Sequence, residues 1–234
     1  MRLLVSPMNT EEAQAALAGG ADIIDVKNPR EGSLGANFPW AIRAVADLAK
    51  GRVPVSATIG DLEFKPGTSS LAALGAAVSG ADYVKAGLLG VKTPAQAEEM
   101  LQGIVRAVKD YDPEKKVVAS GYSDYVRAGS ILPRLLPAAA ANAGADVVMV
   151  DTAVKDGKPT FDFMSEQDLL DFIILGHKSG LQVAIAGNIG FAHLDLLRRL
   201  QPDIIGVRGI VCGGDRRSAI RAELVEKVRS LALG

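Results

Sequence analysis

Four short segments of the chain share one pattern, in which an aspartate introduces an apolar run that ends in or near a charged residue. The introducing aspartates are Asp22, Asp82, Asp146 and Asp203. Such runs are typical of buried parallel strands, whose side chains alternate between two faces. Positions three and five after each aspartate therefore share one face. The ionisable residues at these positions are Asp25, Lys27, Lys85, Asp151 and Arg208. Because ionisable groups rarely occupy a buried strand without a role, the spacing indicates an enzyme.

Two members of this set, Lys27 and Lys85, are candidates for covalent and proton-transfer chemistry. A lysine attacks a carbonyl only as the neutral amine, which is scarce at neutral pH because its reference pKa is about 10.4. Burial and a second nearby cation both favour the neutral form, so the two lysines would activate each other. Asp25 would orient Lys27 or shuttle protons, and Asp151 would supply a second carboxylate. The alternative is that these residues form only structural ion pairs.

Lys155 lies just past Asp151 and is open to two interpretations, a catalytic residue or an exposed loop lysine. The polar loop that directly follows Lys27 contains Arg30 and Ser33. These two side chains would either bind a second anion or only cover the site.

Glycine-rich turns near the end of the chain indicate a phosphate site. Backbone N–H groups in such turns, next to the N-terminus of a short helix, commonly bind phosphate. One turn follows the seventh predicted strand and two follow the eighth. Their candidate binding residues are Gly187, Asn188, Arg208, Gly209, Gly213, Gly214 and Asp215. Each turn alone is also compatible with a tight reversal of the chain, and it is their combination that favours phosphate.

Strand-like and helix-like segments alternate along the whole chain, which predicts parallel strands joined by right-handed crossovers. Four further strands are expected at residues 2–6, 53–59, 116–120 and 183–186. A helix is expected to open at Asn9, and others to cover 39–50, 69–78, 94–109, 132–142, 165–178, 191–200 and 218–233. About eight such units predict a single (β/α)₈ barrel over residues 1–234. A doubly wound sheet is the alternative, but the first turn, residues 6–9, lacks its glycine fingerprint.

The barrel would bring the charged residues together. Copies of the repeated pattern lie about sixty residues apart, which is two units, so they fall on even-numbered strands. Alternate strands of such a barrel contribute to the same interior layers, and catalysis takes place at the C-terminal mouth. Four distant segments would thus form one site.

Composition limits the classes of partner. The net charge of -1 gives no basic surface for nucleic acid, and no apolar stretch is long enough to cross a membrane. A single cysteine, Cys212, fits a reducing cytoplasm and is expected to be a loop thiol. Two separated histidines, His177 and His193, do not suggest a metal site. Apolar helix faces such as residues 132–136 would pack on the barrel or on a second copy, so a homo-oligomer stays open.

Several segments closely resemble the (5-formylfuran-3-yl)methyl phosphate synthase family over essentially the whole chain. The most specific of them surrounds Lys27. The matching segments are residues 3–7, 22–29, 31–40, 65–68, 151–153, 155–158 and 206–209. The resemblance implies a (β/α)₈ barrel lyase of methanofuran biosynthesis. Such a lyase condenses two molecules of glyceraldehyde 3-phosphate into a furan aldehyde phosphate and releases phosphate and water.

The resemblance also implies roles for individual residues. Lys27 matches the Schiff-base lysine and Lys85 the proton acceptor. Asp25, Asp151 and Lys155 match supporting acid–base residues, which favours the catalytic interpretation of Lys155. No metal or organic cofactor is expected, and triose phosphates are the expected small-molecule partners. Two alternatives stay open: another Schiff-base enzyme, such as a triose-phosphate aldolase, and a non-catalytic phosphosugar-binding barrel.

Overall fold

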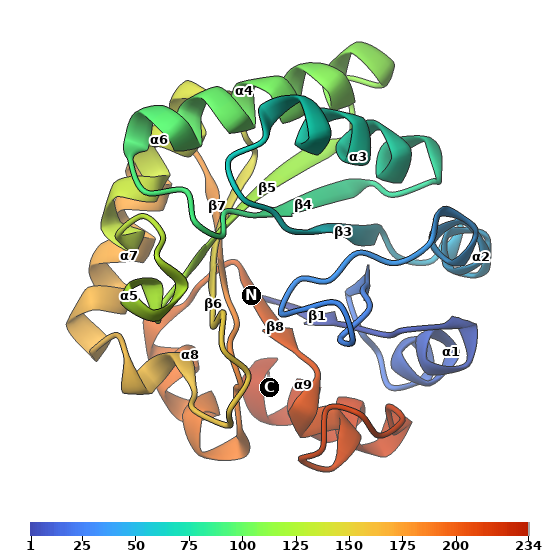
Figure 1. Ribbon diagram of the computed structural model, residues 1–234. Coiled ribbons are helices and arrows are strands. Elements are labelled where there is room, and N and C mark those ends of the chain that lie inside the picture. The colour runs from blue at the N-terminus through green and yellow to red at the C-terminus, as the bar shows by residue number, and fades with distance from the viewer. Residues whose placement is uncertain (234) are drawn as a thin grey trace.

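Eight parallel strands, each paired with the next and the last with the first, close into a barrel in the computed structural model, which describes residues 1–233 (Figure 1). The strands are β1 (Arg2–Val5), β2 (Ile23–Val26), β3 (Val55–Asp61), β4 (Tyr83–Gly87), β5 (Lys116–Tyr122), β6 (Val147–Asp151), β7 (Gln182–Ile185) and β8 (Ile204–Val207). The predicted barrel is confirmed, and the doubly wound alternative is wrong. Gly234, the last residue of the predicted domain, lies outside the described residues.

Helices cover the outside of the barrel (Figure 1). They are α1 (Thr10–Ala18), α2 (Pro39–Ala49), α3 (Pro66–Val78), α4 (Pro94–Tyr111), α5 (Tyr125–Ala128), α6 (Leu136–Asn142), α7 (Glu166–Lys178), α8 (Leu194–Leu200) and α9 (Ala222–Leu233). Local chemistry sets several of the starts. The Asn9 side chain accepts from the Glu12 N–H at 2.9 Å, and proline begins α2, α3 and α4.

Some predicted boundaries are wrong for identifiable reasons. The last helix begins at Ala222 and not at residue 218, because the Asp215 carboxylate accepts from the Arg217 N–H at 2.9 Å and closes a turn there. Segments predicted as helix from 132 and from 191 begin as 3₁₀ turns, η1 (Pro133–Leu135) and η3 (Phe191–His193). The short helices α5, η2 (Thr160–Asp162) and η4 (Gly209–Cys212) lie in loops after strands.

The aspartate that introduces each repeated strand has a structural task at the N-terminal end of the barrel. Its carboxylate accepts a backbone N–H from the preceding strand. These bonds join Asp22 to Leu3 at 2.8 Å, Asp82 to Val55 at 2.8 Å, Asp146 to Val117 at 2.8 Å and Asp203 to Val183 at 2.7 Å. Each repeat therefore contains two features: an aspartate that hydrogen-bonds to the preceding strand at the N-terminal end of the barrel, and a charged residue near the C-terminal end.

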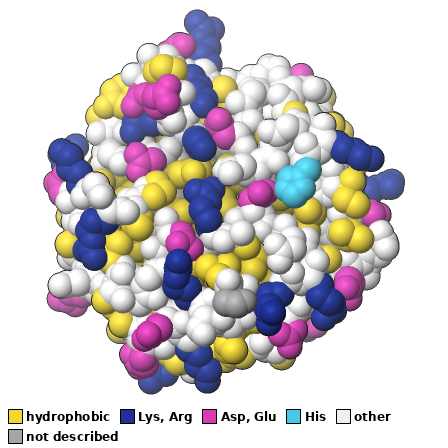
Figure 2. All heavy atoms as spheres, turned by 180° about the vertical axis from the view of Figure 1, so that it is seen from behind, with side chains coloured by type: hydrophobic (Ala, Val, Ile, Leu, Met, Phe, Trp, Pro, Cys, Tyr) yellow, Lys and Arg dark blue, Asp and Glu magenta, His cyan; other side chains and the backbone are white. Residues whose placement is uncertain are grey.

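Apolar side chains fill the barrel interior below the cavity at the carboxyl ends of the strands. They are Leu4, Ile23, Tyr83, Val118, Val147, Met149, Ala184, Ala186 and Ile204. A larger apolar cluster packs between the strands and the helices. Figure 2 shows the molecule from behind relative to Figure 1, and on this face basic and acidic side chains are interspersed. Among residues 1–233, no helix is both long and apolar enough to span a lipid bilayer.

Candidate active site at the barrel mouth

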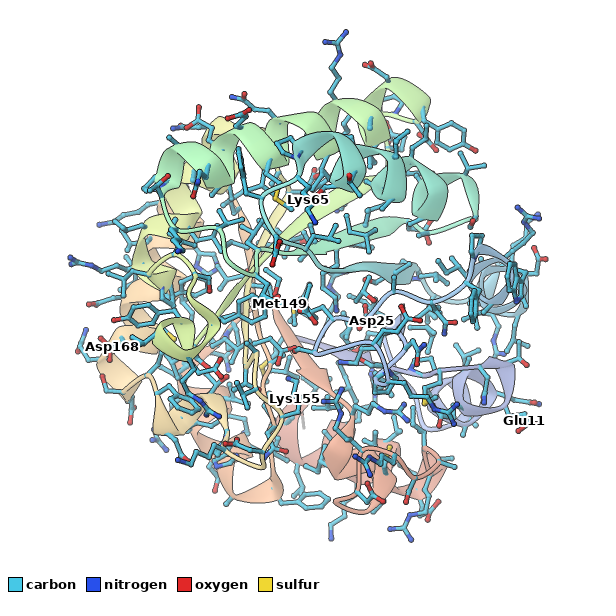
Figure 3. The ribbon with its side chains drawn as sticks, in the orientation of Figure 1. Glu11, Asp25, Lys65, Met149, Lys155 and Asp168 are labelled. Atoms are coloured by element: carbon cyan, nitrogen blue, oxygen red, sulfur yellow. The ribbon has the colours of Figure 1, made fainter. Side chains whose placement is uncertain are left out.

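The carboxyl ends of the strands open into a cavity of about 850 Å³. In Figure 3, Asp25 and Met149 lie within the ring of strands, whereas Glu11 and Asp168 lie outside on the helices. The basic side chains that line the cavity are Lys27, Arg30, Lys85, Lys155, Lys158, Arg208, Arg216 and Arg217. Only Asp151 and Asp215 contribute acidic lining among the described residues. This excess of cations suits an anionic ligand.

A buried ion pair between β2 and β4 occupies the floor of the site. Lys85 Nζ lies 2.7 Å from Asp25 Oδ2, and both side chains are almost fully buried. The same carboxylate accepts hydroxyl hydrogen bonds from Ser6 and Ser56, each at 2.8 Å. Although burial raises the pKa of Asp25, Lys85 and Lys27 hold it below its usual value. Asp25 is therefore a fixed anion that positions Lys85.

A second pair lies at the end of β6. Lys155 Nζ is 2.6 Å from Asp151 Oδ1 and 3.0 Å from the Thr152 hydroxyl oxygen. Burial raises the pKa of Asp151, but Lys155 and Lys27 outweigh it, so the pKa falls to about 2. The carboxylate is also fixed by the Thr152 N–H at 2.7 Å. Lys155 is thus a member of the site and not an isolated loop lysine.

Lys27 lies between these two pairs and differs from both other lysines. Its side chain is buried, and its amine forms no hydrogen bond or ion pair with any group in residues 1–233. Burial lowers the pKa of Lys27 to about 7; Asp151 opposes this shift, and Lys85 and Lys155 reinforce it. About half of the Lys27 amine is therefore neutral near pH 7, as a nucleophile for carbonyl groups requires.

The turns after β7 and β8 supply backbone donors at the other side of the cavity. The N–H groups of Gly187, Asn188 and Gly209 donate to no other group within residues 1–233. Gly187 has φ +100°, and a Cβ atom there would lie 2.2 Å from the Thr160 hydroxyl oxygen. This residue must therefore be glycine for the turn to pack. These three residues line the basic cavity, and N–H groups without a partner are suited to bind phosphate, so the phosphate site stays a prediction.

Other predicted phosphate ligands are placed differently. The Gly214 N–H donates to the Gly209 carbonyl at 2.8 Å, and Asp215 lines the cavity beside it. Gly213 is not part of the cavity lining. Ser33 is buried, and its hydroxyl donates to the Thr152 carbonyl at 2.7 Å, so it joins the β2 loop to the end of β6.

Arg208 and Arg30 differ in how free their side chains are. Arg208 forms a buried ion pair with Glu12 at 2.7 Å, and its guanidinium also donates to backbone carbonyls. Arg30 is exposed at the rim. Donors of Arg208 and Ser33 already bind other groups of the protein. Anion binding by these two residues stays a prediction.

Two further residues at the mouth escaped the sequence analysis. The Tyr122 hydroxyl donates to Asp61 Oδ1 at 2.5 Å, and Asp61 Oδ2 accepts from the Leu34 N–H at 3.0 Å. Burial and the adjacent Asp61 carboxylate raise the pKa of Tyr122 well above its usual value. The pair anchors the loop that follows Lys27. Both residues end strands that continue two positions beyond their predicted limits, which is why the pattern did not include them.

The remaining reactive side chains stay outside this chemistry. Burial raises the pKa of Cys212 to about 11, so its thiolate is scarce at neutral pH. His177 contacts Asp203 at 2.8 Å, and His193 stacks on Phe161 with ring centroids 4.4 Å apart. Within residues 1–233, no three His, Cys, Asp or Glu side chains are grouped as metal ligands.

Comparison with solved structures finds the same barrel architecture in chains of low sequence identity. A crystal structure of 3-hexulose-6-phosphate synthase has a TM-score of 0.68 at 21% identity, and the match covers 99% of each chain. A crystal structure of KGPDC from Streptococcus mutans has a TM-score of 0.67 at 16% identity, covering 99% of this chain and 96% of the other. These likenesses describe the architecture alone.

Sequence comparison is more specific. The chain is 68% identical over 228 residues to the (5-formylfuran-3-yl)methyl phosphate synthase of Methanosarcina acetivorans, with 97% of each protein covered. It is 60% identical to the enzyme of that name from Archaeoglobus fulgidus, with 100% of each covered. The family model described as 4-HFC-P synthase matches residues 3–229. The chain therefore belongs to the 4-HFC-P synthase family.

Proposed function

We propose that this enzyme condenses two molecules of glyceraldehyde 3-phosphate into (5-formylfuran-3-yl)methyl phosphate through a Schiff base on Lys27. The atoms of two triose phosphates equal those of the furan phosphate, one phosphoric acid and two waters, so no oxidant or reductant is needed. The reaction would supply the furan of methanofuran in the cytoplasm, as the resemblance implies. The observation that carries the proposal is the buried amine of Lys27, which has no hydrogen-bond or ion-pair partner among the described residues and whose pKa is about 7.

Lys27 is the nucleophile in this proposal because its amine is the one left without a partner among the three lysines in and beside the strand ends. The neutral amine attacks the aldehyde carbon of the first triose phosphate to give a carbinolamine. Loss of water then gives an iminium ion, which can accept the electron pair left when the C2 proton is removed. The resulting enamine carbon is the nucleophile for the second triose phosphate.

Lys85 serves first as an acid and then as a base. Paired with Asp25 at 2.7 Å, its ammonium can give a proton to the carbinolamine hydroxyl, which leaves as water. The neutral Lys85 amine that results can then accept the C2 proton of the iminium. One residue therefore serves both steps, and Asp25 holds it in place through both charge states.

The Asp151–Lys155 pair and the glycine turns support the later steps. Lys155 Nζ, 2.6 Å from Asp151, can protonate a leaving oxygen as phosphate or water is eliminated before ring closure. The N–H groups of Gly187, Asn188 and Gly209 would hold the phosphate of the triose bound to Lys27. No metal or organic cofactor enters this scheme.

Incubation of the purified protein with glyceraldehyde 3-phosphate alone tests the reaction. We expect one inorganic phosphate to appear for each furan aldehyde, measured by phosphate assay and by mass spectrometry of the product. A six-carbon product that keeps both phosphates would show an aldolase instead. Retention of the triose phosphate with neither product would show a binding protein.

A further inference from the structure

The loop after η4, residues 213–218, is held in place by the buried side chain of Arg208. Its Nε donates to the Arg216 carbonyl at 2.7 Å, and its Nη2 lies 3.5 Å from the Ser218 carbonyl. The other side of the guanidinium is fixed by Glu12, at 2.7 and 3.2 Å, and by the Ser6 carbonyl at 2.7 Å. Arg208 therefore sets the position of this loop over the cavity.

The side chain that this loop presents to the cavity is Arg216. Its guanidinium is half-buried, and its one hydrogen bond within residues 1–233 goes to the Gly32 carbonyl at 3.5 Å. No carboxylate of the described residues lies within 4.0 Å of it. Burial lowers the pKa of Arg216, while Asp151 and Asp61 act against this from a longer range. Arg216 thus lines the cavity, and most of its guanidinium N–H donors have no partner among residues 1–233.

A reaction between two triose phosphates requires two phosphate sites, and the proposed function uses the glycine turns after β7 and β8 for the first of them. Arg216 lies in the β8 loop and reaches the Gly32 carbonyl in the β2 loop. Because β1 separates β8 from β2 and β7 lies on the other side of β8, the side chain extends away from the turn after β7. Arg30, which belongs to the β2 loop, lines the same cavity. A planar guanidinium with free donors is suited to bidentate binding of a phosphate group.

We propose that Arg216, assisted by Arg30, binds the phosphate of the second triose phosphate, the one that is not attached to Lys27. The inference rests on the proposed function, because it needs a reaction between two phosphorylated aldehydes. Arg208 then acts as a positioning residue: it fixes the backbone of Arg216 and leaves the guanidinium of Arg216 to contact substrate.

Two readouts separate the two substrate positions. Borohydride trapping at Lys27 as a function of glyceraldehyde 3-phosphate concentration reports the first triose, and furan formation over the same range reports both. For Arg216→Met we expect the half-saturation of trapping to stay within about 2-fold of wild type. Furan formation should require about 10- to 100-fold more substrate, since a charged hydrogen-bonding group is lost. Arg216→Lys, which keeps the charge but not the fork, should fall between them.

Arg221→Met is the matched control, because Arg221 lies in the same connection, pairs with Glu223 at 3.6 Å and does not line the cavity. Both of its curves should match wild type. Unchanged furan formation in Arg216→Met would overturn the assignment. Parallel rises in both half-saturations would place Arg216 on the first phosphate and overturn it as well. Absence of trapping and furan in the wild type would refute the proposed function itself.

Discussion

Two buried clusters lie at the barrel mouth, and each contains both cations and carboxylates. They differ in how completely the cations are paired. On the β1 and β8 side, Arg208 has Glu12 and three backbone carbonyls as partners. On the β2, β4 and β6 side, three lysines share two carboxylates, and Lys27 is left without either. A buried cation whose donors are all bound by carboxylate or carbonyl oxygens stabilises the structure and stays charged. A buried lysine without a carboxylate partner is partly neutral at physiological pH, and the neutral amine can act as a nucleophile.

The largest expected effect follows from removing the unpaired amine. Lys27→Met should reduce furan formation by at least about 10⁴-fold, as loss of a covalent nucleophile does in other enzymes. The variant should unfold at the same or higher denaturant concentration, because a buried amine is replaced by an apolar side chain. Initial rates and urea titrations check both. Lys178→Met, on the exposed surface of α7, should leave the rate unchanged.

Removing the carboxylate from the fully paired cluster should act on stability instead. Glu12→Ala leaves the buried Arg208 charge without a counter-ion, which costs about 3–5 kcal/mol of unfolding free energy. Urea unfolding of the variant measures this loss. The double variant Glu12→Leu/Arg208→Met should lose less than the single one, because no charge is left unpaired. A single variant as stable as wild type would show that this pair is not a structural tie.

The charges around Lys27 should shift its pKa in opposite directions. Wild-type Lys27 loses reactivity as pH falls through about 7, because the amine becomes protonated. Asp151 raises this pKa and Lys155 lowers it, so Asp151→Asn should move the midpoint to lower pH and Lys155→Met to higher pH. Acetylation of Lys27, followed by peptide mass spectrometry across pH, measures this without turnover. Shifts of the same sign in both variants would contradict the charge arrangement.

The smallest effect is expected at the cysteine. The pKa of Cys212 is about 11, so the thiol is a poor nucleophile. Its side chain is buried and packs in the apolar core cluster. Cys212→Ala should change the rate of furan formation by less than about 2-fold, since no reactive group is lost. Steady-state rates check this. A loss approaching that of Lys27→Met would place a second nucleophile in the mouth.

The sequence predicted the barrel and the reactive half of the mouth because both depend on strand periodicity. Residues three and five after each repeated aspartate share a face, and this rule alone brought Asp25, Lys27, Lys85 and Asp151 together. Strand pairing in a closed barrel carries that local pattern directly into space.

The contacts that helices and loops make with the site could not be predicted from the sequence. Glu12 lies on α1 and reaches Arg208 across 196 residues, and no local pattern links the two. Arg216 lies in an irregular loop whose path is set by Arg208. Ser33 was expected at the cavity but turns inward to the Thr152 carbonyl. Side-chain direction in a loop depends on contacts that form only once the barrel is closed.

Borohydride reduction in the presence of glyceraldehyde 3-phosphate, followed by peptide mass mapping, shows directly whether Lys27 forms the Schiff base. We expect a triose phosphate adduct on Lys27, with Lys85 and Lys155 unmodified. An adduct on Lys85 in place of Lys27, or furan formation without any trapped adduct, would contradict covalent catalysis by Lys27.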